Sequence, residues 1–499
     1  MHLSVPMACR VMNMTTNWER PGRCSRRGDS ISLCIRGTIV RAGGSFDGSW
    51  EGSCDRQSCI DPVVVRALKT VATDGGEQAV LASTSTALGK SNGLRVLVVS
   101  QHFWPENLRI NEVVLSLRSC GVNVEVLTGQ PNYPKGEIFA GYSAIGVGSE
   151  RHPLGYVIHR VPVVPRGRGG TLRRVANYFS FVLSALIFAP WLTRGERYDV
   201  IFVYAISPIL QGLPAAFLKR LKHAALVIWV QDLWPDSLES TGYVRNRAAL
   251  AVVAAVTGFI YRQADLLLAQ SRGFVDKIRE LAGSGVPIAY HPNPGDIALV
   301  EEAADASSAI AIDPGCFNVI FAGNLGAAQA LDTIVACAEA IVDPSIRIIL
   351  VGGGSRATWL REEIARRALR NLELAGQYPA EAMPAILAHA SALLVTLGRA
   401  DNLALTIPSK IPTYLAAGRP IIGALDGEGA ALIRDAQAGI AVSAEDAAAL
   451  ASAIVEMRNL PAEQRGAMGA SGRAYFDKHL SPTPLAQDLV QHFHKAIGR

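Results

Sequence analysis

The chain has 499 residues, of which 49% are hydrophobic and 18% charged, so it can form two or three domains with buried cores. Its net charge of +5 is mild, and no run of Lys and Arg interleaved with aromatic residues occurs, so no nucleic-acid partner is expected. The eight cysteines lack zinc-finger spacing. Because the N-terminus lacks an apolar run of signal-peptide length, we expect a cytoplasmic protein, with peripheral attachment to the inner membrane face left open.

Residues 1–92 differ in character from the rest of the chain. They carry clusters of Gly, Ser and Arg and show no regular alternation of strand and helix patterns. Such a composition favours a disordered extension, or an upstream translation that is not part of the working enzyme.

Residues 93–295 read as a first Rossmann-like domain. Apolar runs of strand length alternate there with helical patterns, which is typical of right-handed βαβ units around a parallel sheet. A helix is expected from Leu108 to Ser119. The predicted strands are Leu94–Ser100, Val122–Thr128, Tyr156–Pro162, Val200–Tyr204, Leu226–Val230, Leu266–Ala269 and Ile288–His291.

The same pattern restarts in residues 296–480, after a polar, Ala-rich connection. Residues 481–499 read as a C-terminal helix that packs back on the first domain. The sequence therefore predicts an α/β protein with two doubly wound domains, whose ligands lie beyond the carboxyl ends of the strands in a cleft between the halves. The predicted strands are Asn318–Ala322, Ile346–Val351, Leu372–Ala375, Ala392–Thr396, Pro420–Gly423 and Gly439–Val442.

A glycine turn stands between the first strand and the first helix of the second half, in FNVIFAGNLGAAQALD (317–332). Backbone N–H groups at the mouth of a helix lack partners and suit an anion. We therefore expect Gly323, Asn324, Leu325 and Gly326 to bind a nucleotide diphosphate. An ordinary strand-to-helix turn is an equally good interpretation of this motif alone.

Two further segments of the second half could meet a phosphate. Gly353 and Gly354 follow a strand, with the guanidinium of Arg356 close by. Ser409 and Lys410 precede a short helix, where a hydroxyl and an ammonium can bind an anion. The alternatives are a tight turn with a surface Arg, and an ordinary helix cap with a solvated Lys.

In the first half, VIWVQDLWPDS delivers Asp232 to the carboxyl end of a strand, followed by Trp234. Asp232 is either a catalytic or ligand-orienting carboxylate or a helix cap, and Asp236 is the better cap. Tyr204 ends another strand at the same edge.

From about Leu94 onward the chain resembles the GT-B glycosyltransferases of family four, in the branch that builds O-antigen, colanic acid and other exopolysaccharides. The resemblance is carried by five motifs in family order: FWPEN, PNYPKG, DLWPDS, FAGNLGAAQALD and PSKIPTYLAAGRPI. It implies retaining transfer of a sugar from a nucleotide diphosphate sugar as co-substrate, without a metal or other cofactor. It also implies donor binding by the second half and acceptor binding by the first, where Pro105, Glu106, Asn107, Tyr204 and Trp234 are the candidates.

The chain departs from the wider family at its charged positions. Leu405 and Thr413 stand where many members have two glutamates, and Asn324 and Gln329 stand where many have Arg and Lys. Because a diphosphate needs charged partners, we expect Lys410, Gln329 and Arg356 to hold it, with Lys410 also stabilising the leaving group. Asp426 and Glu428 are candidates for the ribose, and Asp232 for orienting sugar or acceptor hydroxyls.

The acceptor is expected to be a polyprenyl-diphosphate-linked sugar or a saccharide. Residues 175–192 carry no charge and are flanked by arginines, so they form a buried helix, a membrane-surface helix or a membrane span. A core helix that also contacts the membrane interface is favoured, because a span would disrupt the sheet. Two other functions remain open, a nucleotide-sugar epimerase of the same architecture and a non-catalytic donor-binding partner.

Overall fold

The computed structural model describes residues 32–35, 38–41, 93–167, 170–240, 246–295 and 312–498. The chain divides into two compact units, Met1–Ser58 and Cys59–Arg499. In the first unit, Ser32–Ile35 (β1) and Thr38–Arg41 (β2) form an antiparallel pair. The remainder of residues 1–92, where disorder was predicted, lies outside the described residues.

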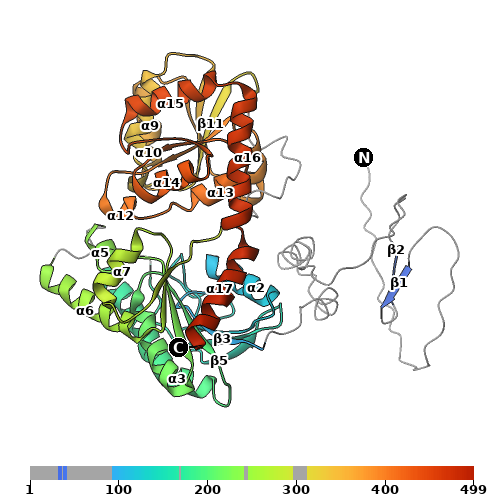
Figure 1. Ribbon diagram of the computed structural model, residues 1–499, viewed down its shortest axis with the longest axis vertical. Helices are drawn as coiled ribbons and strands as arrows, with labels where there is room; N and C mark the ends of the chain where they lie inside the picture. The colour runs from blue at the N-terminus through green and yellow to red at the C-terminus, as the bar shows by residue number, and fades with distance from the viewer. Residues whose placement is uncertain are drawn as a thin grey trace, which may run out of the picture. The chain divides into compact units, whose positions relative to one another are not determined.

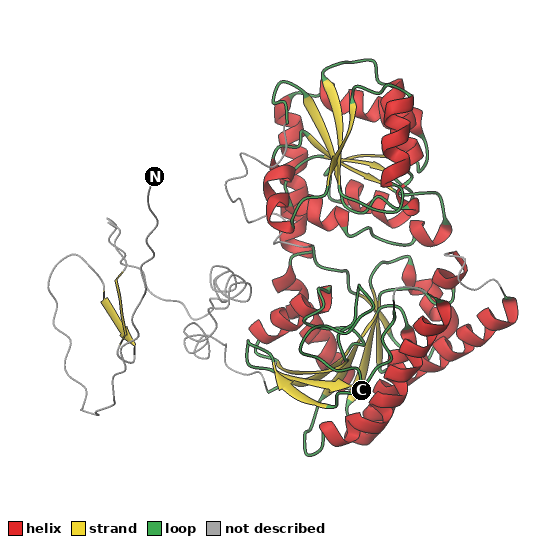
Figure 2. Ribbon diagram, turned by 180° about the vertical axis from the view of Figure 1, so that it is seen from behind, coloured by secondary structure: helices red, strands yellow, loops and turns green. Residues whose placement is uncertain are grey.

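Within the described part of the second unit, the first sheet has eight strands in the order β10-β9-β8-β7-β3-β4-β6-β5. Helices flank this sheet (Figures 1 and 2). Every neighbouring pair is parallel except β5 and β6, which are antiparallel. The strands are β3 (Arg95–Val99), β4 (Asn123–Gly129), β5 (Gly148–Arg151), β6 (Val157–Val161), β7 (Val200–Ala205), β8 (Ala225–Val230), β9 (Leu266–Ala269) and β10 (Ile288–Tyr290).

Helices cover both faces of this sheet. Phe181 from α3, Leu218 from α4 and Ile260 from α6 pack in one buried apolar cluster. On the other face of the sheet, a second buried apolar cluster contains Leu117 from α2 and Phe493 from the C-terminal helix α17. The helices are α2 (Arg109–Ser119), α3 (Thr171–Leu192), α4 (Gly212–Lys222), α5 (Asp236–Ser240), α6 (Arg247–Gln263), α7 (Phe274–Ala282) and α17 (Pro482–Ile497).

The second sheet is wholly parallel, with the order β13-β12-β11-β14-β15-β16. Its strands are β11 (Phe317–Ala322), β12 (Ile346–Val351), β13 (Leu372–Gly376), β14 (Ala392–Thr396), β15 (Ile421–Ala424) and β16 (Gly439–Val442). Its helices are α9 (Leu331–Ala340), α10 (Ala357–Arg366), α11 (Met383–Ala388), α12 (Asp401–Ala404), α13 (Lys410–Ala416), α14 (Gly427–Asp435), α15 (Ala447–Asn459) and α16 (Ala462–His479). Buried clusters on both faces complete a second Rossmann-like domain.

The fold prediction is confirmed, because every predicted strand from Leu94 onward begins and ends within one residue of an observed one. Sequence analysis missed β5, with the sequence GSER, because it is an edge strand whose residues alternate between half-buried and exposed. It therefore lacks the apolar run that marks a buried parallel strand.

Candidate functional site

Two glycine turns of the second domain are hydrogen-bonded to each other. The amide of Gly323 donates to the carbonyl of Val351 at 2.8 Å, and the amide of Leu325 donates to the carbonyl of Gly353 at 2.8 Å. Gly352 has φ +140°, and a Cβ built there would lie 1.9 Å from the carbonyl oxygen of Gly323. The close approach of the two turns therefore requires glycine at position 352.

This pairing changes the predicted anion cradle. The amides of Gly323 and Leu325 already have acceptors, so the expectation that all four amides of the turn are bare is wrong. Within the described residues, the amides of Asn324, Gly326, Gly353 and Gly354 donate to no acceptor. They are the backbone donors that remain for a ligand.

Helix α9 does not open directly at the glycine turn. A 3₁₀ turn at Ala327–Gln329 and Ala330, with φ +46°, separate the turn from the first residue of α9, Leu331. The positive end of the α9 dipole is therefore displaced along the chain from the turn, contrary to the prediction.

Lys410 lies directly beside the first turn. Its ammonium donates a 2.6 Å hydrogen bond to Oε1 of Gln329 and lies 4.7 Å from the centre of the Phe321 ring. A Cβ built on Gly323 would lie 3.4 Å from Nζ of Lys410. Burial lowers the pKa of Lys410 to about 8. Among the described residues no carboxylate forms an ion pair with this ammonium, so its charge remains available for a ligand.

Arg356 is engaged differently from the prediction. Its guanidinium pairs with the carboxylate of Asp332 through two nitrogens, one of them at 3.1 Å, and lies 3.7 Å from the centre of the Trp359 ring. The hydrogen bond from Arg356 lowers the pKa of Asp332. This ion pair uses two of the five N–H donors of the guanidinium, so Arg356 is partly engaged by Asp332, and its role in donor binding stays a prediction.

Asp426 and Glu428, the two carboxylates predicted to bind the ribose, contact different segments of the protein. Asp426 accepts from the amide of Ala444 at 3.1 Å, and Arg399 approaches its other oxygen at 3.7 Å. Glu428 faces the turn after β9, where its Oε1 would lie 3.2 Å from a Cβ on Gly273.

The structure also shows the surroundings of Ser409, in the PSK segment, and of Leu405, which stands where many family members have a glutamate. Ser409 is exposed at the start of α13. The carbonyl of Leu405 accepts a hydrogen bond from the hydroxyl of Ser271, which follows β9.

In the first domain, Asp232 holds the turn that follows β7. Its Oδ2 accepts from both the amide and the hydroxyl of Ser207 at 2.9 Å, and Trp234 Nε1 donates to that hydroxyl at 2.9 Å. Tyr204 and Trp234 are buried, and burial raises the pKa of Tyr204 to about 12. These two aromatic residues therefore support the site from within, rather than exposing an acceptor surface as predicted.

Sequence analysis missed a cluster of three amide side chains at the carboxyl ends of β8, β9 and β10. Asn293 Nδ2 donates to Oε1 of Gln231 at 2.8 Å and of Gln270 at 3.3 Å. Nε2 of Gln231 and Oδ1 of Asn293 are buried and have no hydrogen-bond partner in the part of the chain that the structure describes. Their positions just after predicted strands were the signal that could have found them.

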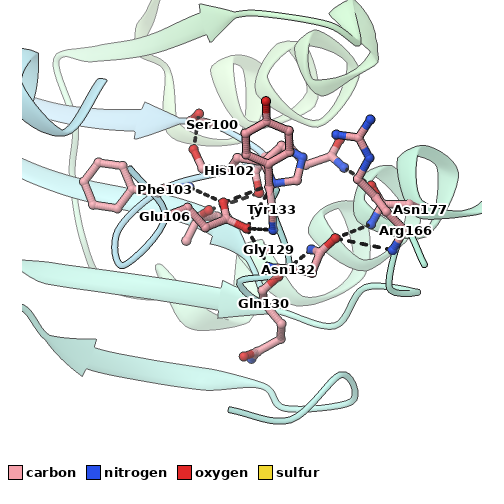
Figure 3. A network of polar contacts seen from close by, with 12 residues as sticks. Ser100, His102, Phe103, Glu106, Gly129, Gln130, Asn132, Tyr133, Arg166 and Asn177 are labelled. Atoms are coloured by element: carbon pink, nitrogen blue, oxygen red, sulfur yellow. Dashed lines mark hydrogen bonds and ion pairs between the residues drawn. The ribbon is translucent and has the colours of Figure 1, made fainter. Parts of the chain in front are cut away.

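Glu106 is almost fully buried and holds two loops together (Figure 3). Its carboxylate accepts from the amides of Phe103 at 3.1 Å, Asn132 at 2.6 Å and Tyr133 at 2.7 Å. His102 Nδ1 lies 3.0 Å from the same carboxylate. The motifs FWPEN and PNYPKG thus meet at one buried charge. Glu106 cannot touch an acceptor as predicted, whereas Asn107 is exposed and Pro105 is half-buried.

His102 is a further residue that sequence analysis missed. A carboxylate at Nδ1 favours the tautomer in which Nδ1 carries the proton and Nε2 is an acceptor. Nε2 is buried and has no hydrogen-bond partner among the described residues. This ring nitrogen can therefore accept a hydrogen bond from a ligand hydroxyl.

Paired Rossmann-like domains and this arrangement of turns define a GT-B architecture, and two family descriptions match it. Residues 107–294 match the glycosyl transferase 4-like domain, and residues 316–459 match glycosyl transferases group 1. The putative colanic acid biosynthesis glycosyl transferase WcaI of Escherichia coli (strain K12) is 25% identical over 340 residues, which cover 65% of this chain and 82% of that protein. The chain belongs to the GT-B glycosyltransferases, in the branch of exopolysaccharide biosynthesis.

Solved structures share the fold at low sequence identity. Sucrose-phosphate synthase from Thermosynechococcus elongatus superposes with a TM-score of 0.63 at 16% identity, covering 81% of this chain and 99% of that one. Anabaena HepE in complex with UDP superposes with a TM-score of 0.57 at 14% identity, covering 80% and 100%.

The hydrogen bonds to Glu106 predict a large loss of stability on its replacement by Gln. The amide cannot accept from three backbone N–H groups as the carboxylate does, so buried donors lose partners at a cost of about 1–3 kcal/mol or more. Urea unfolding should show a lower midpoint for Glu106→Gln, and the exposed Glu362 replaced by Gln should leave it unchanged. Equal midpoints for the two variants would contradict the bracing role of Glu106.

Proposed function

We propose that this glycosyltransferase transfers a hexose from a nucleotide diphosphate sugar to a lipid-linked or saccharide acceptor of a cell-surface polysaccharide, with retention of anomeric configuration. The observation that carries donor binding is the ammonium of Lys410, which lies beside the Gly323 turn and has no carboxylate partner within the described ranges. Fold relatives support it, since HepE was solved in complex with UDP and with UDP-glucose.

Lys410 and the unpaired turn amides would act on the leaving group. As the bond between the anomeric carbon and the phosphate oxygen breaks, negative charge grows on the diphosphate. The Lys410 ammonium and the amides of Asn324 and Gly326 stabilise that charge because they are fixed in place before the reaction. The acceptor oxygen forms the new bond on the same face, and its proton passes to the departing phosphate oxygen. This route needs no protein nucleophile.

The first domain would hold the acceptor and the sugar through side chains with spare hydrogen-bonding capacity. His102 Nε2 and Asn293 Oδ1 can accept from hydroxyls, and Gln231 Nε2 can donate. Asp232 acts on the site through Ser207 and the turn after β7. Its role is therefore positioning, unless its second carboxylate oxygen meets a hydroxyl directly.

Helix α3 supports an acceptor at a membrane. One face of α3 packs on the domain through Phe181, Ala185 and Ala189. The opposite face is apolar and exposed over the length of the helix, at Leu172, Val175, Phe179, Leu183, Ile187 and Trp191. By length and composition the segment Leu172–Leu192 could cross a membrane, but its packing on the sheet favours a helix that lies at the surface of a bilayer.

Basic residues flank this exposed apolar face. Arg173 precedes it, and Arg194 and Arg197 follow it, all of them exposed. Such flanks favour anionic headgroups, so we propose peripheral attachment to the cytoplasmic face of the inner membrane, where a polyprenyl-diphosphate acceptor would be available.

A non-catalytic donor-binding protein is the second candidate, favoured by Leu405 and Thr413 in place of two family glutamates. Calorimetry with nucleotide sugars, combined with product analysis using membrane extract, separates the possibilities. Label in the lipid or polysaccharide fraction supports the transferase, and binding without turnover supports the alternative. Donor consumption without an acceptor would indicate the epimerase.

Replacing Lys410 by Ala should lower kcat/KM for the donor about 10–100-fold. A charge-assisted hydrogen bond to phosphate contributes roughly 1.5–3 kcal/mol, and each 1.4 kcal/mol is tenfold. Steady-state kinetics measures this loss, with the nucleotide sugar that calorimetry and product analysis identify as the donor. The exposed Lys478 replaced by Ala is the matched control and should keep the native value. Native kinetics in Lys410→Ala would remove this residue from the site.

The pH dependence of kcat/KM should follow the pKa of Lys410. Because this pKa is lowered to about 8, the ammonium is present below pH 8 and is lost as the pH rises through that value. The ratio should therefore fall about tenfold per pH unit well above pH 8. In Lys410→Arg this limb should be absent, because a guanidinium stays protonated. An unchanged limb in that variant would assign the titration to another group.

Exchanging Leu183 and Ile187 together for Gln should weaken binding to anionic vesicles at least tenfold. Each apolar side chain contributes about 1.5–3 kcal/mol when it leaves water, and both are more than half exposed in the protein. Co-sedimentation with vesicles measures the binding. Val342→Gln, an exposed apolar site of the second domain, should have no effect. Unchanged co-sedimentation of the double variant would exclude α3 as the membrane contact.

A further inference from the structure

Three potential metal ligands meet where the C-terminal helix α17 crosses the first domain. His291 follows β10, where its amide donates to the carbonyl of Ala269 at 2.9 Å and its carbonyl accepts from Trp229 Nε1 at 2.9 Å. Asp488 and His492 are four residues apart on α17 and so lie on one face of the helix. The ligands therefore come from a fixed strand end and from the regular helix α17, which Figure 1 labels.

The spacing of the donor atoms suits a small divalent ion. His291 Nδ1 lies 3.2 Å from Asp488 Oδ2, and His492 Nε2 lies 3.1 Å from the same oxygen. One ligand atom from each residue lies within 4.8 Å of the other two. In a tetrahedral zinc site with bonds of about 2.0–2.1 Å, neighbouring donor atoms are roughly 3.3 Å apart. The distances from Asp488 Oδ2 to His291 Nδ1 and to His492 Nε2 therefore match those between neighbouring ligand atoms of a tetrahedral zinc site.

The hydrogen bonding of His492 supplies an independent reason for a ligand. Its side chain is more than nine-tenths buried, yet neither ring nitrogen has a hydrogen-bond partner among the described residues. The approach of Nε2 to Asp488 is close but lacks hydrogen-bond geometry. Because buried polar atoms are normally satisfied, an imidazole in this position requires an explanation. A metal ion bound at Nε2 would use its lone pair.

The geometry points to a binding site for one divalent transition-metal ion, with Zn²⁺ as the expected occupant, formed by His291, Asp488 and His492. Two imidazoles and one carboxylate are ligands that zinc accepts, and a water completes a set of four. Asp488 is 43% exposed, so it opens the site to solvent and gives the ion a path of entry.

The ion would have a structural role. Leu489, Phe493 and Ala496 of α17 are buried in the same apolar cluster as β3, β8 and α2. The ligands join residues that are 197 positions apart in the chain, so the ion would fasten α17 to the end of β10. In the described residues, none of the three ligands is among the contacts of Lys410 or of the Gly323 turn, so the proposed metal site and the proposed donor site share no residue.

The test uses the full chain without an affinity tag, freed of metal by chelation and titrated with Zn²⁺. Calorimetry should give one equivalent bound, and the Tm should rise by roughly 5–10 °C at a free Zn²⁺ concentration about a hundred times Kd. Co²⁺ in place of Zn²⁺ should give the visible absorption of a tetrahedral site. Absence of stoichiometric binding by the native chain would overturn the proposal.

Three single substitutions locate the ion. His492→Gln and Asp488→Asn should each weaken Zn²⁺ binding at least tenfold, because the loss of a group that only supports a ligand already costs about 10–100-fold in metal affinity. His494→Gln is the matched control, because His494 is exposed on the same helix and should not matter. If His492→Gln fails to fold, the half-exposed Asp488→Asn decides. Native affinity in Asp488→Asn, or equal loss in His494→Gln, would overturn the site.

Discussion

The ammonium of Lys410 lies against the Gly323 turn without a counter-charge among the described residues, and the proposed donor binding rests on this arrangement. Its polar partner is the neutral side-chain oxygen of Gln329, and burial lowers the pKa to about 8. A buried ammonium in this state loses hydration without gaining an ion pair. In the proposed function, a diphosphate would supply the missing charge, and the energetic penalty in the free protein would become selectivity for an anionic donor.

In the first domain, by contrast, the buried carboxylate of Glu106 has its hydrogen-bond partners within the protein. Glu106 is surrounded by the amides of Phe103, Asn132 and Tyr133 and by His102, so its carboxylate is fully used within the protein. Such a satisfied charge makes the loops rigid and fixes the ring of His102. In the first domain, the carboxylate of Glu106 therefore fixes the loop conformation, whereas in the second domain the ammonium of Lys410 is proposed to bind the ligand. The side chains with unused capacity in the first domain are neutral, as expected for the recognition of hydroxyl groups.

Helices α17 and α3, which pack on opposite faces of the first sheet, differ in the side chains that they leave uncovered. Helix α17 buries Phe493 on the sheet and turns Asp488 and His492 toward the end of β10. Helix α3 buries Phe181 and exposes a second apolar face at Phe179 and Leu183. The second apolar face of α3 is exposed, and in the proposed function a bilayer surface would cover it.

Apart from the edge strand β5, the strands from Leu94 onward followed from the sequence, because buried parallel strands require continuous apolar runs such as LRVLVVS and FNVIFA. The resemblance to the glycosyltransferase family also came from local motifs. The sequence singled out Lys410 and Gly323 separately, since a glycine turn and a PSK segment are each recognisable over a few residues.

Tertiary structure alone decided which of these groups remain available. Lys410 meets Gln329 across 81 positions, and Arg356 is captured by Asp332 across 24. The amides of Gly323 and Leu325 are taken by the neighbouring turn, and His291 meets Asp488 across 197 positions. Local sequence patterns specify where a strand or turn forms, because the causes are local. Whether a charge or an amide is left free depends on long-range packing, which no single segment encodes.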